Sequence, residues 1–235
     1  MRVATLGVDC AEIWNLELPP VDLLVLPELA LTPWLCATRD VDPVAWEQAA
    51  RDQPLERLPE FGAQVVIGTL ATVADGRRYN DAFCWTADGL TLVHRKTFLP
   101  DEPGFWEATW YERGPVEFCA FDTPVGRIGV SICTEMWFSQ HRYPDVDIVV
   151  VPRATPDETT AKWLAGGCTH AVTSGAFCLS SNRAETFMGG AGWIIDPDGV
   201  PLAVTTPQDS LAIADIDLQE ARTAKQSYPR YVSTD

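Results

Sequence analysis

The chain has 235 residues, of which 46% are hydrophobic and 21% charged, and these values exclude a disulfide-stapled miniprotein and a wholly disordered chain. Its 33 acidic and 17 basic residues give a formal net charge of −16, which disfavours binding to nucleic acids and to anionic membranes. No apolar run approaches the roughly 18 residues of a membrane span, so we predict a soluble, cytoplasmic protein.

Short apolar runs rich in β-branched and aromatic residues recur along the chain and predict strands. In chain order they are Arg2–Asp9, Asp22–Leu26, Gln64–Leu70, Asn80–Thr86, Leu90–Arg95, Glu117–Phe121, Arg127–Cys133, Asp147–Val151, Ala176–Ser181, Gly192–Asp196 and Leu211–Ile216. Helices are predicted over Val44–Arg51, after Cys133, and over Asp157–Ser174. Because turns join some strands and helices join others, the pattern predicts a layered α/β protein.

The connection between the first two predicted strands, Cys10–Asp22, is short and contains Pro19-Pro20, which would break a helix. We therefore expect the first helix to be short or absent. No repeat or linker divides the chain. Residues 1–235 are accordingly predicted to form a single domain with a short C-terminal tail, Gln226–Asp235.

The seven cysteines predict reduced thiols. Their number is odd, no pair has C-x-x-C spacing, and none has metal-ligand spacing with a histidine. This pattern argues against a disulfide framework or a zinc site and favours a reducing compartment.

Three predicted strands end in side chains that can carry chemistry: Glu28, Lys96 and Cys133. The carboxyl ends of strands in an α/β sheet face the ligand crevice, so residues far apart in sequence can meet there. Such a trio can perform acyl transfer. Glu28 would deprotonate the thiol of Cys133, and Lys96 would stabilise the thiolate and the oxyanion of the tetrahedral intermediate.

Each of these residues also has a simpler interpretation. A cysteine that ends an apolar strand is usually an inert core thiol, and Glu28 or Lys96 alone would usually be a solvated charge. A papain-like pair of Cys133 with His141 or His170 is a second alternative. A third is a scaffold without activity that serves as a binding or assembly subunit.

Ordered motifs surround the three residues. Pro27-Glu28, then His94–Pro100, then Gly129–Glu135 occur in this order, accompanied by Tyr79–Ala82, Ser181–Arg183, Gly192–Gly199 and Ala214–Asp217. Together they resemble the nitrilase superfamily of carbon–nitrogen hydrolases, and the resemblance spans nearly the whole chain. The segment from Lys96 to Glu107 is most similar to the carbamoylputrescine amidase branch.

The resemblance implies an α-β-β-α sandwich that associates into a homodimer or a larger homo-oligomer, with no metal and no organic cofactor. It implies hydrolysis of a small linear amide or N-carbamoyl amine through a thioester on Cys133, with Glu28 and Lys96 completing the triad. Nitrile hydrolysis by the same triad stays open. The resemblance also implies that Glu107 orients the substrate and Lys96, whereas a surface charge on a loop is its alternative.

Three further residues near these motifs are candidates for substrate binding. The backbone N–H of Thr134 directly follows the nucleophile and could stabilise an oxyanion. Trp106 and Trp137 could form walls of an apolar pocket.

Arg153 is a fourth candidate, because it lies at the end of a predicted strand. Its guanidinium could bind a substrate carboxylate, or it could form an ion pair with Asp157 or Glu158. Glu135, close to the nucleophile, is expected to brace the loop after Cys133.

Overall fold

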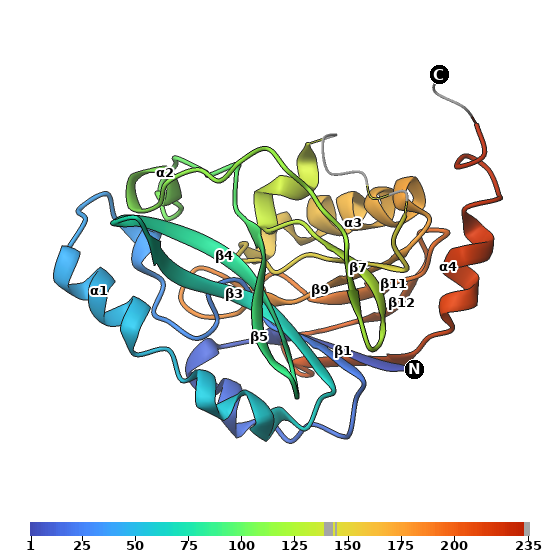
Figure 1. The fold of residues 1–235 in the computed structure, drawn as a ribbon, viewed down its shortest axis with the longest axis horizontal. Helices are drawn as coiled ribbons and strands as arrows, with labels where there is room; N and C mark the ends of the chain where they lie inside the picture. The colour runs from blue at the N-terminus through green and yellow to red at the C-terminus, as the bar shows by residue number, and fades with distance from the viewer. Residues whose placement is uncertain (139–142, 144, 233–235) are drawn as a thin grey trace.

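The computed structural model describes residues 1–138, 143 and 145–232, and it contains two β-sheets that share a core (Figure 1). The first sheet has the order β10 (Asn182–Arg183), β1 (Arg2–Val8), β2 (Leu23–Val25), β3 (Val65–Ala74), β4 (Arg77–Thr86) and β5 (Gly89–Arg95), and β13 (Leu211–Asp215) also pairs with β1. The second has the order β12 (Pro201–Val204), β11 (Trp193–Ile195), β9 (Phe177–Ser180), β8 (Ile148–Val150), β7 (Gly126–Val130) and β6 (Phe121–Thr123).

The central strands are buried on both faces, which explains their nearly continuous apolar sequences. On β2, Leu23 and Val25 belong to the core between the sheets, whereas Leu24 belongs to the core on the outer face of the first sheet. This alternation follows from the two-residue period of a strand.

Helical segments cover the outer face of each sheet. The 3-10 helices η1 (Cys10–Asn15) and η3 (Leu55–Phe61), with α1 (Pro43–Arg51), cover the first sheet, and α3 (Thr160–Ser174) covers the second. Figure 1 shows α1 and α3 on opposite sides of the molecule. The remaining short helices are η2 (Leu35–Ala37), α2 (Glu107–Trp110), η4 (Cys133–Trp137), η6 (Asp157–Thr159) and α4 (Leu218–Ala224). The predicted α-β-β-α sandwich is confirmed.

Most predicted strands correspond to observed ones, and the segment between β1 and β2 contains the 3-10 helix η1. The strand predicted at Glu117–Phe121 is wrong: β6 begins only at Phe121, where the hairpin first brings this segment alongside β7. Strand β12 was not predicted, because it is an exposed edge strand that begins with Pro201. The segment predicted to be helical after Cys133 forms the 3-10 helix η4.

The two sheets join at one end of the molecule. The chain leaves β9 in the second sheet, passes through Ser181 and enters β10 in the first. Ser181 Oγ donates to the carbonyl oxygen of Val25 at 2.6 Å, and the N–H of Glu28 donates to the carbonyl oxygen of Arg153 at 3.2 Å. The segments that follow β2 and β8 therefore meet at this end.

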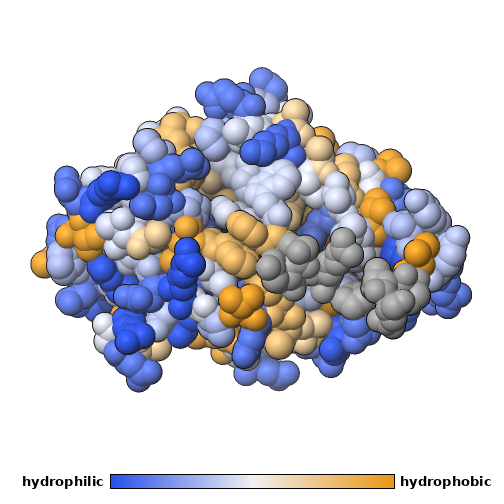
Figure 2. Space-filling model, turned by 90° about the horizontal axis from the view of Figure 1, so that it is seen from above, coloured by the Kyte–Doolittle hydropathy of each residue, from blue (hydrophilic) through white to orange (hydrophobic). Residues whose placement is uncertain are grey.

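The surface mixes polar and apolar residues. Figure 2 shows hydrophilic and hydrophobic residues interspersed over the face that it presents. All seven cysteines are free thiols in the structure. Among the described residues, no helix is long and apolar enough to cross a membrane.

Candidate active site

The loop that carries Glu28 is held by buried hydrogen bonds. Leu29, which has a positive φ of 48°, donates its N–H to Thr69 Oγ1 at 2.7 Å. The buried guanidinium of Arg183 donates to the carbonyl oxygens of Glu28 at 3.2 Å, Leu29 at 2.6 Å and Thr32 at 3.3 Å. These bonds hold the backbone of the loop against β3 and β10 of the first sheet.

Lys96 lies at the centre of a buried cluster of charges. Its Nζ is 2.7 Å from Glu28 Oε1 and 2.7 Å from each carboxylate oxygen of Glu107. Asn80 Nδ2 donates to Glu28 Oε1 at 2.8 Å and to Glu107 Oε2 at 3.5 Å. The backbone carbonyl oxygen of Asn80 accepts the backbone N–H of Lys96 at 2.9 Å. Glu107 is 1% exposed, so the alternative that it is a surface charge on a loop is wrong.

Cys133 begins η4 on a sharp turn directly after the β7 segment. Its φ of 48° lies in the left-handed region, a strained conformation for a residue other than glycine. Its N–H donates to the carbonyl oxygen of Pro152 at 2.9 Å, and its Sγ lies 4.0 Å from the carbonyl oxygen of Ala154. Thr134 follows in the first turn of η4, where N–H groups have no partner within the helix.

Burial controls the protonation of this site. Burial raises the pKa of the Cys133 thiol, the charge of Glu28 raises it further, and Lys96 only partly opposes them, so the resting thiol is protonated. Burial opposes the charge of Lys96, but Glu107 and Glu28 outweigh it and raise the pKa of Lys96.

A proton acceptor is available within the same cluster. Glu28 Oε2 is buried and has no hydrogen-bond partner among the residues that the structure describes. The other oxygen, Oε1, is bound by Lys96 and Asn80, which orient the carboxylate. Glu28 can therefore accept a proton without first giving up a hydrogen bond.

The surroundings of the Arg153 side chain differ from the ion pair considered as one prediction. The guanidinium is fully buried and donates to Ser180 Oγ at 2.7 Å, to Thr155 Oγ1 at 2.9 Å and to the carbonyl oxygen of Ala191, and it lies 3.8 Å from the ring centre of Trp193.

The alternative prediction, an ion pair of Arg153 with Asp157 or Glu158, is wrong. The guanidinium donates its hydrogen bonds to neutral oxygens, and the described residues include no contact of Arg153 with either carboxylate. The role of Arg153 in binding a substrate carboxylate stays a prediction.

The two candidate tryptophans lie in different surroundings. Trp106 is half-buried next to Glu107, and the guanidinium of Arg39 stacks 3.8 Å from its ring centre. Trp137 is 41% exposed and packs against Trp163 of α3, with ring centres 5.0 Å apart. Their roles as pocket walls remain predictions.

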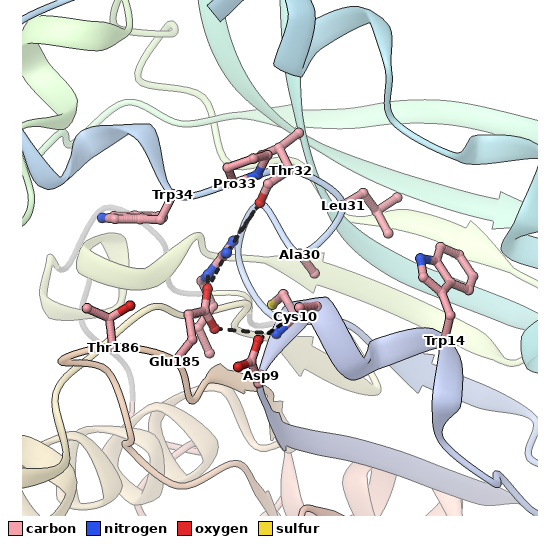
Figure 3. Close-up of a pocket in the computed structure, with 12 residues that line it drawn as sticks. Asp9, Cys10, Trp14, Ala30, Leu31, Thr32, Pro33, Trp34, Glu185 and Thr186 are labelled. Atoms are coloured by element: carbon pink, nitrogen blue, oxygen red, sulfur yellow. Dashed lines mark hydrogen bonds and ion pairs between the residues drawn. The ribbon is translucent and has the colours of Figure 1, made fainter. Parts of the chain in front are cut away.

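A pocket of about 530 Å³ lies beside the loop that carries Glu28 (Figure 3). Trp14 lies at one end of it and Trp34 and Thr186 at the other, and its lining includes none of the predicted catalytic residues. The pocket is formed by the outer side of the loop, next to the Arg183–Glu185 ion pair.

The alternative histidine partners of Cys133 receive no support. His141 lies outside the described residues, and His170 is a buried residue of α3 whose ring faces Tyr143 at 6.5 Å. Within the described part of the chain, no group of three or more His, Cys, Asp or Glu side chains could hold a metal ion.

Sequence reasoning did not assign roles to Asn80 and Arg183, although both lie in segments that resemble the superfamily. Asn80 lies opposite Ala71 on β3, and Arg183 pairs with the end of β1. Their contacts with the Glu28 loop depend on which strands are neighbours, and a single sequence carries no direct signal of this.

Comparisons with known proteins find amidases among the relatives of this chain. The chain is 29% identical over 181 residues to N-carbamoylputrescine amidase of Oryza sativa subsp. japonica, a match that covers 66% of this chain and 60% of the relative. It is 27% identical over 186 residues to an omega-amidase of Bos taurus, covering 72% of this chain and 67% of that protein. The chain thus spans about 60% of the length of the first relative.

The fold and a family sequence model both match carbon-nitrogen hydrolases. The solved structure of a carbon-nitrogen hydrolase from Helicobacter pylori G27 has a TM-score of 0.81 at 20% identity, covering 98% of this chain and 94% of that one. Residues 14–226 match the sequence model described as carbon-nitrogen hydrolase. The predicted resemblance to the nitrilase superfamily is therefore confirmed, and the chain belongs to the carbon-nitrogen hydrolase family.

Proposed function

We propose that this protein hydrolyses a small linear amide or N-carbamoyl amine through a thioester on Cys133. The observation that carries the proposal is the buried cluster in which Lys96 Nζ lies 2.7 Å from carboxylate oxygens of both Glu28 and Glu107. Similarity to an N-carbamoylputrescine amidase and to an omega-amidase supports this class of substrate.

The first half of the reaction forms the thioester. Glu28 Oε2 takes the proton of the Cys133 thiol as the sulfur attacks the substrate carbonyl carbon. The carbonyl electron pair moves to oxygen, and the ammonium of Lys96 and the N–H of Thr134 stabilise that oxyanion. When the intermediate collapses, the C–N bond breaks and protonated Glu28 donates its proton to the departing ammonia or amine.

The second half releases the product. Glu28, again a carboxylate, takes a proton from water as the water oxygen attacks the thioester carbon. The C–S bond then breaks, and the proton held by Glu28 returns to the sulfur of Cys133. Throughout both halves Glu107 holds Lys96 in its charged form.

We also propose that residues 1–235 form one catalytic domain, because segments from both sheets contribute to the site. Trp106, Trp137 and Arg153 are its proposed substrate contacts. A homo-oligomeric state and a cytoplasmic location stay predictions, and gel filtration tests the first of them.

The experiment is intact-protein mass spectrometry during incubation with N-carbamoyl amines, ω-amides and small nitriles, with ammonia release followed in parallel. We expect an acyl adduct that maps to Cys133 and turnover that Cys133→Ala abolishes. Cys119→Ala, which removes an exposed thiol, is the matched control and should keep full turnover. Turnover that survives in Cys133→Ala, or no turnover on the whole panel by folded, reduced protein, would contradict the proposal.

A further inference from the structure

The carboxylate of Glu135 connects the segment of Lys96 to the segment of Cys133. Glu135 Oε1 accepts the N–H of Thr97 at 2.7 Å, and Oε2 accepts the N–H of Ile132 at 2.7 Å. Thr97 directly follows Lys96, and Ile132 directly precedes Cys133. Glu135 was expected to brace the loop after Cys133; its carboxylate instead binds the residue before Cys133 and also reaches the lysine loop.

These two loops come from different sheets. Lys96 follows β5 in the first sheet, and Cys133 follows β7 in the second. The carboxylate of Glu135 therefore spans the gap between the sheets at the point where the two side chains must meet. Hydrogen bonds to an ionised acceptor are shorter and stronger than neutral ones, so this link resists displacement.

A third donor completes the surroundings of the carboxylate. His94 Nε2 lies 2.7 Å from Glu135 Oε2, and both side chains are buried, with 4% and 0% exposed. Because a carboxylate only accepts hydrogen bonds, Nε2 must carry the hydrogen. The His94 ring packs against Phe118 with ring centres 4.9 Å apart, which fixes its direction.

We propose that Glu135, oriented by His94, is a positioning residue that sets the separation of Lys96 and Cys133. The inference rests on the proposed function, since that reaction needs the ammonium close to the sulfur and the oxyanion. Glu135 acts through the backbone, because its hydrogen bonds in the described chain go to two N–H groups and His94. A misplacement of reacting groups by about 1 Å can lower a rate on the order of 100-fold.

The decisive variant is Glu135→Gln, which puts an NH₂ donor where a carboxylate oxygen accepts an N–H. Two rates are measured: alkylation of Cys133 by iodoacetamide, followed on the Cys133 peptide by mass spectrometry, and kcat on an amide substrate. We expect both rates to fall on the order of 100-fold, while KM changes by less than about threefold.

Asp147→Asn is the matched control. Asp147 is also a buried carboxylate, 8% exposed, and it accepts the N–H of Arg127 at 3.1 Å and pairs with Arg222 at 3.1 Å. It precedes β8, at the end opposite to the strand ends that carry the site. We expect a comparable loss of Tm with both rates within about twofold of the wild-type protein.

His94→Phe tests the same link with a smaller change, since it leaves the carboxylate of Glu135 unaltered. It keeps an aromatic ring against Phe118, removes the donor to Glu135, and leaves both backbone hydrogen bonds in place. We expect an intermediate loss of Cys133 alkylation and of kcat. His94→Gln restores an N–H donor and should recover part of both rates.

Three outcomes decide the inference. Equal rates in Glu135→Gln and Asp147→Asn would overturn it. If Glu135→Gln does not fold, His94→Phe decides instead, and wild-type alkylation of Cys133 in that variant would overturn it. If the wild-type protein hydrolyses no amide, the proposed function fails, whereas the alkylation rates still test the positioning role separately.

Discussion

Lys96 and Arg153 are two fully buried cations at the same end of the molecule, but their surroundings are opposite. Lys96 is bound by two carboxylates at 2.7 Å. Arg153 donates only to neutral oxygens within the described chain and stacks on Trp193. The comparison separates the effect of burial from the effect of partners.

Burial acts to lower the pKa of both cations, but their net pKa shifts have opposite directions. Burial lowers the pKa of Arg153 to about 9, because the opposing charges nearby, that of Glu28 included, offset the burial only in part. The pKa of Lys96 is raised instead, since Glu107 and Glu28 outweigh its burial. Burial with paired charges therefore creates a group that can stabilise a developing anion. Burial with neutral acceptors creates an anchor that holds loops together.

The largest expected effect comes from Lys96→Met, which leaves Glu28 and Glu107 buried together without a cation. We expect a loss of about 3–5 kcal/mol in the free energy of unfolding and at least about 10²–10³-fold in kcat. Urea unfolding and ammonia release measure the two effects. Lys162→Met removes an exposed lysine and should change neither quantity. Substantial turnover by Lys96→Met would show that the buried ammonium does not stabilise the developing anion.

Glu107→Gln should lower kcat by about 10–100-fold, because Lys96 loses one of its two charged partners. The pKa of Glu107 is raised from 4.5 to about 7, first by burial and then by the charge of Glu28. Between these values the folded protein holds a proton that the unfolded chain releases. This group therefore lowers the free energy of unfolding as the pH rises from 4.5 to about 7.

The pH dependence of the stability of the same variant tests whether Glu107 takes up a proton in the folded protein. Glutamine does not titrate, so the free energy of unfolding of Glu107→Gln should rise relative to that of the wild-type protein across the window from 4.5 to about 7. Urea unfolding at a series of pH values measures this difference. A difference that does not change with pH would show that Glu107 stays ionised throughout.

Arg153→Gln should have a smaller effect on catalysis than either change near Lys96. Its loss leaves neutral oxygens unpaired, which we expect to lower the free energy of unfolding by about 1–3 kcal/mol with kcat changed by less than about tenfold. Kinetics on neutral and carboxylate-bearing amides measure the second effect. A selective loss of the carboxylate-bearing substrates would support the proposed contact of Arg153 with a substrate carboxylate, and equal changes for both kinds of amide would contradict it.

The smallest effect is expected for Arg39→Ala. The Arg39 side chain is 60% exposed, pairs with Asp101 at 3.4 Å and stacks on Trp106. Exposed ion pairs contribute little, so we expect less than about 1 kcal/mol in unfolding and an unchanged kcat. A large rise in KM for this variant would indicate that Arg39 orients Trp106 as a wall of the substrate pocket.

The sequence alone determined the order of the elements and the residues that carry the proposed chemistry. Glu28, Lys96 and Cys133 could be predicted because each ends an apolar run that predicts a strand, strand ends in an α/β fold converge, and the ordered motifs around them resemble the superfamily. Glu107 came from the resemblance of its segment to the superfamily. These inferences depend on local pattern and motif order, which a single sequence contains.

The side chains that surround this chemistry became known from the folded structure and not from the sequence. Asn80 and Arg183 reach the Glu28 loop because their strands happen to be neighbours of β3 and β1. Arg153 faces Ser180 and Trp193 because the pairing beyond β8 sets the direction of its side chain. Glu135 bonds to Thr97 across two sheets. Contacts of this kind depend on strand register and sheet packing, and these are set by the folded chain as a whole.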